Sequence, residues 1–181
     1  MRFLKEDTCL LVIDVQEKLF PHIYDNDFLE KNINILIKGM QNLEVPMLFT
    51  EQYKKGLGET IHSIKENFVW EFKSIEKMAF SCVDELNFIQ ELGKLNKKNV
   101  IIAGIETHVC VLQTAIDLKS LSYNVMVVED CVSSRKISDK SNAIKRLIQE
   151  GVFIGSYESI LLELCRESGT ETFKNISKLI K

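Results

Sequence analysis

The chain has 181 residues, of which 45% are hydrophobic and 27% are charged, and its formal net charge at pH 7 is -3. This length and composition favour one globular domain, residues 1–181, with a sizeable core. The negative charge argues against a nucleic-acid partner. No apolar run approaches the roughly 18 residues that a membrane span needs, so no membrane association is expected, and the N-terminus does not resemble a signal peptide.

The number and spacing of the cysteines indicate the cellular compartment of the protein. The five cysteines are an odd number and form no Cys-x-x-Cys pair, which favours free thiols in a reducing environment, so we predict a cytoplasmic protein. Four of them (Cys9, Cys82, Cys131 and Cys165) are expected to be ordinary small hydrophobic residues. Only Cys110 stands in a pattern that indicates chemistry.

The first half of the chain begins with a strand. The run 8–13 is continuously apolar and ends at Asp14, which is typical of a strand buried on both faces of a parallel sheet. Apolar residues with helical spacing from Leu29 to Met40 predict a helix, and residues 45–50 predict the second strand. Between 51 and 80 the pattern is weaker. We expect a short helix within 59–67 and a short strand within 70–74.

The second half of the chain again alternates predicted strands and helices. A capping signal at Ser81 predicts a helix ending near Leu95, followed by an apolar strand from residue 99 to 103. A polar turn leads to a helix headed by Cys110. A strand at 124–128 is expected to stop at Glu129-Asp130, and a helix, a short strand at 151–155 and two C-terminal helices follow.

Alternating strands and helices predict an α/β fold. Specifically, we expect a Rossmann-like three-layer α/β/α sandwich with a mostly parallel sheet of about six strands. No Gly-x-Gly-x-x-Gly motif follows the first strand, which disfavours dinucleotide binding.

In such sheets, ligands bind at the carboxyl ends of the strands. Asp14 ends the first strand, and Cys110 follows the strand at 99–103 at the start of a helix. A helix N-terminus favours the thiolate, so we expect the Cys110 thiol to ionise easily. A neighbouring carboxylate can accept the thiol proton. From the residues alone, an Asp at a strand end is equally compatible with an ordinary cap or turn residue.

Two motifs sharpen this interpretation. The segments LLVIDVQEKLF and GIETHVCVLQTA resemble the isochorismatase-like cysteine hydrolases, the superfamily that includes the nicotinamidases. Asp14-Val15-Gln16 matches the family's Asp-x-Gln, and residues 104–115 match its more specific cysteine motif. The order of elements agrees over nearly the whole chain. The resemblance implies a hydrolase with a covalent thioester intermediate at Cys110.

The resemblance also implies the partners of the thiol. Lys77 matches the family's third catalytic residue, with Lys73 as the alternative, and a cation near the sulfur lowers the thiol pKa. A cis peptide bond is implied between Ile105 and Glu106, which turns the Glu106 N–H toward the substrate. Together with the Cys110 N–H it would form an oxyanion hole.

The chain departs from the metal-binding nicotinamidases. Where these carry Asp-x-His, the sequence reads Glu51-Gln52-Tyr53, so no metal and no other cofactor is expected and nicotinamide is not favoured as substrate. By analogy, Gln16, Phe20, Gln52 and Tyr53 would line the pocket, although ordinary loop packing explains them equally well. Whether His108 touches the substrate stays open.

The leading hypothesis is therefore a cytoplasmic cysteine hydrolase of a small amide or related acyl substrate. A cysteine at position 110 argues against isochorismate cleavage, because family members with that activity lack it. The alternatives are a non-catalytic oligomeric scaffold and a redox-sensing thiol, for which no resolving cysteine is evident in the sequence. We expect a homo-oligomer, and the apolar face formed by Phe173, Ile176 and Ile180 could pack across subunits.

Overall fold

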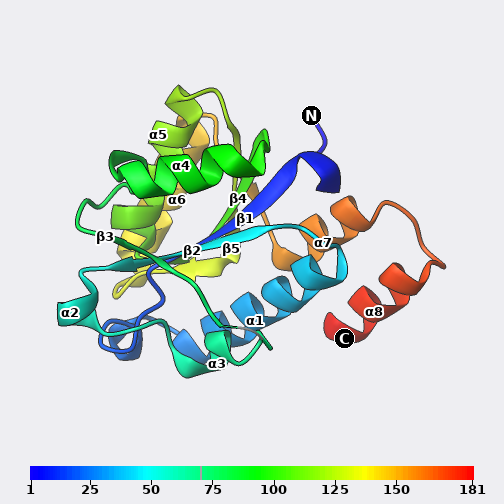
Figure 1. Cartoon of the computed structure of the whole chain (residues 1–181), viewed down its shortest axis with the longest axis horizontal. Helices are drawn as coiled ribbons and strands as arrows, with labels where there is room; N and C mark the ends of the chain where they lie inside the picture. The colour runs from blue at the N-terminus through cyan, green and yellow to red at the C-terminus, as the bar shows by residue number, and fades with distance from the viewer. Residues whose placement is uncertain (70) are drawn as a thin grey trace.

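The computed structural model describes residues 1–69 and 71–181. Its centre is a six-stranded sheet in which all neighbouring strands are parallel, in the order β3-β2-β1-β4-β5-β6 (Figure 1). The strands are β1 (Thr8–Ile13), β2 (Met47–Gln52), β3 (Ile75–Lys77), β4 (Asn99–Ile105), β5 (Asn124–Ser133) and β6 (Phe153–Gly155). The predicted fold class is confirmed.

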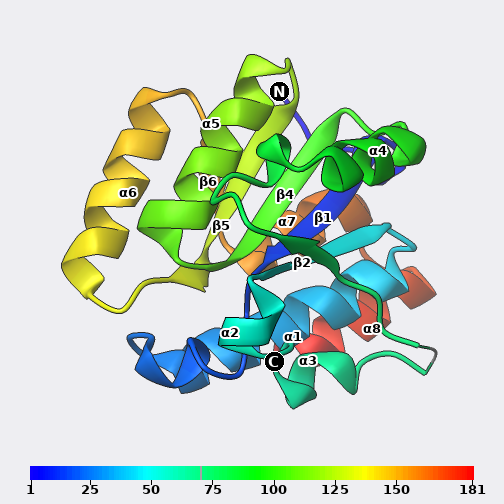
Figure 2. The ribbon, with the colours of Figure 1, turned by 60° about the vertical axis from the view of Figure 1, so that its left-hand side comes forward.

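Helices cover both faces of the sheet (Figures 1 and 2). One face packs against α1 (Asn26–Asn42) and α7 (Tyr157–Cys165), and α8 (Glu171–Leu179) packs against these two helices. The other face packs against α4 (Leu86–Leu95), α5 (Leu112–Ser120) and α6 (Ile137–Gln149). Short α2 (Lys54–Leu57) and α3 (His62–Lys65) lie between β2 and β3. Because both faces are covered, every residue of β1 and β4 is buried, which explains their continuous apolarity.

Two predicted strands differ from the structure. The short strand expected within 70–74 is β3, which begins at Ile75 and pairs with residues 50–52 of β2, while residue 70 lies outside the described residues. β5 does not stop at Glu129-Asp130 but continues to Ser133. The register of β4 and β5 shifts between Ile102 and Gly104, so the polar pair is accommodated as an irregularity and pairing resumes beyond it.

The C-terminal helix α8 packs against other helices of the same chain. Ile176 of α8 is fully buried, and Ile180 packs against the same hydrophobic cluster, which includes residues of α1 and α7. The prediction that this face packs across subunits is therefore not supported by the packing of these two residues.

Gly104 permits the close approach of β4 to β1. Its φ is +120°, and an added Cβ would lie 2.1 Å from the Ile13 carbonyl oxygen. Ile13 directly precedes Asp14, so this approach brings the ends of β1 and β4 together. Only glycine adopts this conformation and leaves this space.

We expect Gly104→Ala to lower the free energy of unfolding by at least about 2 kcal/mol, because it adds both backbone strain and a clash with backbone atoms. Urea unfolding followed by circular dichroism measures this. Gly93→Ala in α4 is the matched control, since an added Cβ there meets no atom within 4 Å. It should raise the stability by about 0.5–1 kcal/mol. Equal effects of the two substitutions would contradict the steric argument.

Candidate active site

The sheet order places a switch point between β1 and β4. The chain leaves β1 toward β2 on one side, and β4 lies on the other, so a crevice forms where these two strands end. Asp14 follows β1 directly, and Cys110 lies in the turn η4 (Thr107–Val111) after β4. Lys77 is the last residue of β3. The structure therefore brings the three predicted residues to the same edge of the sheet.

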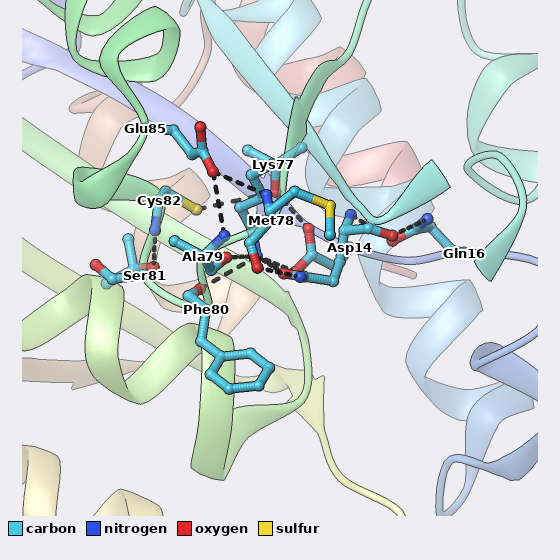
Figure 3. Close-up of polar contacts among 12 residues, drawn as sticks. Asp14, Gln16, Lys77, Met78, Ala79, Phe80, Ser81, Cys82 and Glu85 are labelled. Atoms are coloured by element: carbon cyan, nitrogen blue, oxygen red, sulfur yellow. Dashed lines mark hydrogen bonds and ion pairs between the residues drawn. The ribbon is translucent and has the colours of Figure 1, made fainter. Parts of the chain in front are cut away.

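Asp14 and Lys77 form a buried ion pair. The Lys77 Nζ lies 2.7 Å from the Asp14 Oδ2, and the side chains are 0% and 1% exposed. The ammonium also contacts the Gln52 Oε1 at 2.6 Å and the carbonyl oxygens of Ala79 and Phe80 at 3.2 and 3.1 Å (Figure 3). An ammonium has only three N–H donors, so four oxygens more than satisfy it. Burial, the largest single effect, lowers the pKa of Lys77, but the charge and hydrogen bond of Asp14 together with the neighbouring Cys110 and Cys82 outweigh it and raise the pKa.

Lys73, the alternative to Lys77, has a different position. It is exposed and lines a groove beside Met47 and Phe49 on β2. The contact with Asp14 is made by Lys77.

Asp14 has the surroundings of a base. Its φ of 53° is in the left-handed region, which non-glycine residues rarely adopt outside turns and functional sites. Burial raises the pKa of the Asp14 carboxyl, while Lys77, a hydrogen bond from Thr50 and one from Cys110 oppose the rise. A carboxylate with a raised pKa accepts a proton more readily than a solvated one.

Cys110 lies in a π-helical turn, ahead of the α-helix that begins at Leu112. The thiol lies close enough to the Asp14 carboxylate for each group to shift the pKa of the other. Burial and the Asp14 charge raise the thiol pKa to about 12, although Lys77 lowers it. The expectation of an easily ionised thiol is therefore wrong, because burial and a neighbouring anion outweigh the helix N-terminus. The thiol is protonated at neutral pH and needs a base.

The turn that contains Glu106 and His108 is hydrogen-bonded to the segment that follows β5. The peptide bond between Ile105 and Glu106 is cis, as the resemblance implies. The Glu106 Oε2 accepts hydrogen bonds from the backbone N–H and the Nε of Arg135, both at 3.0 Å. The His108 Nδ1 lies 2.9 Å from the Ser134 Oγ, and its Nε2 lies 4.0 Å from the Asp139 Oδ2. Both ring nitrogens of His108 thus face residues 134–139.

The predicted substrate-lining residues have protein partners. The buried Gln16 amide accepts from the Gln52 N–H at 2.7 Å and donates to the Gln52 and Gly58 carbonyls at 2.9 and 2.7 Å. The Gln52 side chain contacts Lys77 and donates to the Met78 carbonyl. Phe20 is buried in the core beside α1, and Tyr53 is 46% exposed. Substrate contact by these four residues stays a prediction.

Sequence reasoning missed several supporting residues. The Glu85 Oε1 accepts from the backbone N–H groups of Met78 and Ala79 at 2.8 and 3.1 Å, which holds the segment around the Lys77 ammonium (Figure 3). Nothing in the sequence singles out Glu85. Thr50 ends the second predicted strand, but its place beside Asp14 follows from the structure, in which it pairs in register with Ile13.

Glu51 stands where the metal-binding nicotinamidases carry the Asp of Asp-x-His, and its side chain contacts other residues of the chain. The Glu51 Oε1 accepts from the Thr60 N–H at 2.7 Å and from the Thr60 hydroxyl at 2.9 Å. The Lys54 Nζ lies 3.2 Å from the Glu51 Oε2. Within the described part of the chain, no three His, Cys, Asp or Glu residues are grouped to hold a metal ion, and no helix is long and apolar enough to cross a membrane.

The fold and site define an α/β protein with a thiol, a carboxylate and an ammonium at the switch point of a parallel sheet. The isochorismatase domain model matches residues 8–159. Isochorismatase family protein 1B of Dictyostelium discoideum is 35% identical, over 99% of this chain and 89% of its own length. Isochorismatase domain-containing protein 2A of Mus musculus is 36% identical, over 99% and 85%. The chain belongs to the isochorismatase family, whose members are generally hydrolases.

Solved structures agree with this assignment. A structure titled MAR1 ribonuclease from Caenorhabditis elegans is 36% identical with a TM-score of 0.92, covering 99% of this chain and 92% of that one. YcaC from Escherichia coli, described as an octameric hydrolase of unknown specificity, has a TM-score of 0.92 at 23% identity, covering 99% and 89%. The second likeness supports the fold alone.

We expect Asp14→Asn to speed alkylation of Cys110 by iodoacetamide at pH 7.5. The substitution removes the anion that raises the thiol pKa and leaves the Lys77 cation that lowers it. The thiolate fraction, and with it the rate, should rise about tenfold for each unit by which the pKa falls. Peptide mass mapping identifies the labelled thiol, with Cys110→Ala as the control for labelling elsewhere. A rate equal to or below that of the wild type would contradict the assigned electrostatics.

Proposed function

We propose that this protein is a cysteine hydrolase that cleaves a small amide or a related acyl compound through a thioester at Cys110. The observation that carries the proposal is that a protonated thiol lies next to the Asp14 carboxylate, whose charge raises the thiol pKa and whose Oδ2 is 2.7 Å from the Lys77 Nζ. A weak nucleophile, an adjacent base and a group that orients the base are the parts of nucleophilic catalysis.

In the proposed mechanism, Asp14 accepts the Cys110 proton as the sulfur attacks the substrate carbonyl. The tetrahedral oxyanion is held by the backbone N–H groups of Glu106 and Cys110. Asp14 then protonates the leaving amine, and the C–N bond breaks to leave a thioester. Asp14 next accepts a proton from the water that attacks the thioester, and it returns this proton to the departing sulfur, which releases the acid and restores the free thiol. Lys77 keeps its proton throughout and holds the carboxylate in place.

The burial of the site favours a small substrate. Cys110 is 7% exposed, and Asp14 and Lys77 are 1% exposed. The name of the nematode relative raises RNA cleavage as a second candidate. The formal net charge of -3 provides no general attraction for a phosphate backbone, so we favour the small acyl substrate.

We also propose that the protein is a cytoplasmic homo-oligomer. All five cysteines are free, which is typical of a reducing compartment. Met78 and Phe80, 65% and 55% exposed, flank the segment around the Lys77 ammonium and would be covered in an assembly. A purely scaffolding role is less favoured, because the contacts among Asp14, Lys77 and Cys110 are intact.

The hydrolase is tested with a panel of small amides and esters, using mass spectrometry of the intact protein to detect acylation. Wild type should carry an acyl adduct on Cys110 with any compound that it turns over, and Cys110→Ala should lose at least about 10³-fold in turnover. Cys165→Ala is the matched control, since this partly exposed thiol lies on α7. It should retain full activity.

A turned-over substrate that leaves no adduct on Cys110, even after rapid acid quenching, would refute the covalent mechanism. An RNA oligonucleotide belongs in the panel. Its cleavage by wild type, with every amide and ester untouched, would favour the second candidate.

The contact of Glu106 with Arg135 allows a test of the oxyanion turn. Arg135→Met removes the guanidinium contact at 3.0 Å and leaves the backbone one. We expect kcat for a turned-over amide to fall between about 10- and 100-fold with KM little changed, because the oxyanion donor is displaced. Lys136→Met, at the exposed neighbouring position, should change neither constant. Equal kinetics for the two variants would contradict this role of Arg135.

A further inference from the structure

Thr50 is bonded to the candidate base from the neighbouring strand. It is the residue of β2 that pairs with Ile13, and its carbonyl accepts the Asp14 N–H at 3.1 Å. Its hydroxyl oxygen lies 2.7 Å from the Asp14 Oδ1, and both residues are 1% exposed. Thr50 thus forms hydrogen bonds with both the backbone and the side chain of Asp14 at a site that is buried from solvent.

The direction of this hydrogen bond follows from the donors available. An ionised carboxylate only accepts, so the Thr50 hydroxyl donates its single proton to Oδ1. The Cys82 Sγ lies 3.9 Å from the same hydroxyl oxygen, and must then donate to it. Burial raises the pKa of the Cys82 thiol to about 12, so this thiol keeps its proton at neutral pH. The donors run from Cys82 to Thr50 to Oδ1.

The second carboxylate oxygen is left available. Oδ2 is buried and lies 2.7 Å from the Lys77 Nζ, but no group in the described residues makes a well-aligned hydrogen bond to it. Oδ2 thus retains acceptor capacity beside the ammonium. Oδ1, in contrast, already accepts a short hydrogen bond from Thr50.

We infer that Thr50 is a positioning residue which fixes the Asp14 carboxylate so that it can take the Cys110 proton, and that Cys82 orients the Thr50 hydroxyl. The transfer breaks the S–H bond and forms an O–H bond on the carboxylate, leaving the thiolate beside the Lys77 ammonium. The inference rests on the proposed function for the identity of the proton donor. The contacts that link Cys82, Thr50 and Asp14 do not depend on that function.

The groups that face Asp14 come from four elements. Lys77 lies on β3, Thr50 on β2, Cys110 in η4 and Cys82 in η3 (Cys82–Asp84). The Thr50 hydrogen bond favours the charged carboxylate, so its removal should raise the apparent pKa of Asp14. A hydrogen bond to a charged group corresponds to a shift of about one to two units.

The test is a ¹³C NMR titration of protein labelled at the Asp side-chain carboxyl, with the Asp14 signal assigned by Asp14→Asn. Thr50→Val, of similar shape but without the hydroxyl, should raise the Asp14 pKa by about one to two units. Thr50→Ser keeps the donor and should stay within about 0.3 units of wild type. If a substrate is known, the acid limb of its kcat/KM profile should move by the same amount in Thr50→Val only.

Cys82 provides a second pair of variants that leaves Thr50 intact. Cys82→Ala should raise the Asp14 pKa by less than Thr50→Val does, and Cys82→Ser, which keeps a donor, should not raise it. This pair decides the question if Thr50→Val does not fold.

An unchanged titration in Thr50→Val, or an equal shift in Thr50→Ser, would overturn the positioning role. Identical titrations in the two Cys82 variants would overturn the role of Cys82. The NMR readout needs no turnover, so the expected shifts in a protein that hydrolyses no amide would refute the proposed function and leave the bonding of Asp14 as described.

Discussion

The buried ion pair between Asp14 and Lys77 is the constraint on which the site depends. Both charges are removed from water, and the cost of desolvating two ions exceeds their mutual attraction unless further hydrogen bonds satisfy them. The chain supplies these bonds. Thr50 donates to the carboxylate, while Gln52 and the carbonyls of Ala79 and Phe80 accept from the ammonium. The surrounding loops must therefore supply hydrogen-bonding groups to the buried ion pair.

The loops around the pair are tied to one another by side-chain amides and carboxylates. Gln16 bonds the backbone after β1 to the backbone at Gln52 and Gly58, and Gln52 in turn contacts Lys77. Glu85 binds the two N–H groups next to the carbonyls that face the ammonium. Loops normally vary and move more than the elements they connect. Here each of three loops carries a bond to another, so the ends of β1, β2 and β3 form one unit.

The sequence predicts some residues of the fold and the candidate site better than others. The order of strands and helices followed from apolar runs and spacing, and Asp14 followed from the rule that ligands bind where parallel strands end. Lys77 came only from the resemblance, because β3 has three residues and its position was predicted too early in the chain. The pairing of β3 with β2, which no local pattern encodes, decides where Lys77 lies.

The error about the thiol has a physical cause. Position in the sequence indicated a helix start, and a helix start favours a thiolate. The pKa of Cys110 is instead set by burial and by Asp14, a residue 96 positions away, and neither quantity is present in the local sequence. The same holds for β5, whose continuation past Glu129-Asp130 depends on pairing with β4. Local patterns predict elements, whereas tertiary contacts decide ionisation.

A thiol with a high pKa is compatible with the proposed chemistry when the charges of the site are considered together. Before proton transfer, the Lys77 cation is balanced by the Asp14 carboxylate. After transfer, the same cation is balanced by the Cys110 thiolate, and Asp14 is neutral. The net charge of the buried site is zero in both states, so the transfer moves an anion between two neighbours of one ammonium and adds no uncompensated charge. Burial and the Asp14 carboxylate thus keep the thiol protonated at rest, and the fixed Lys77 ammonium makes its ionisation feasible when a carbonyl approaches.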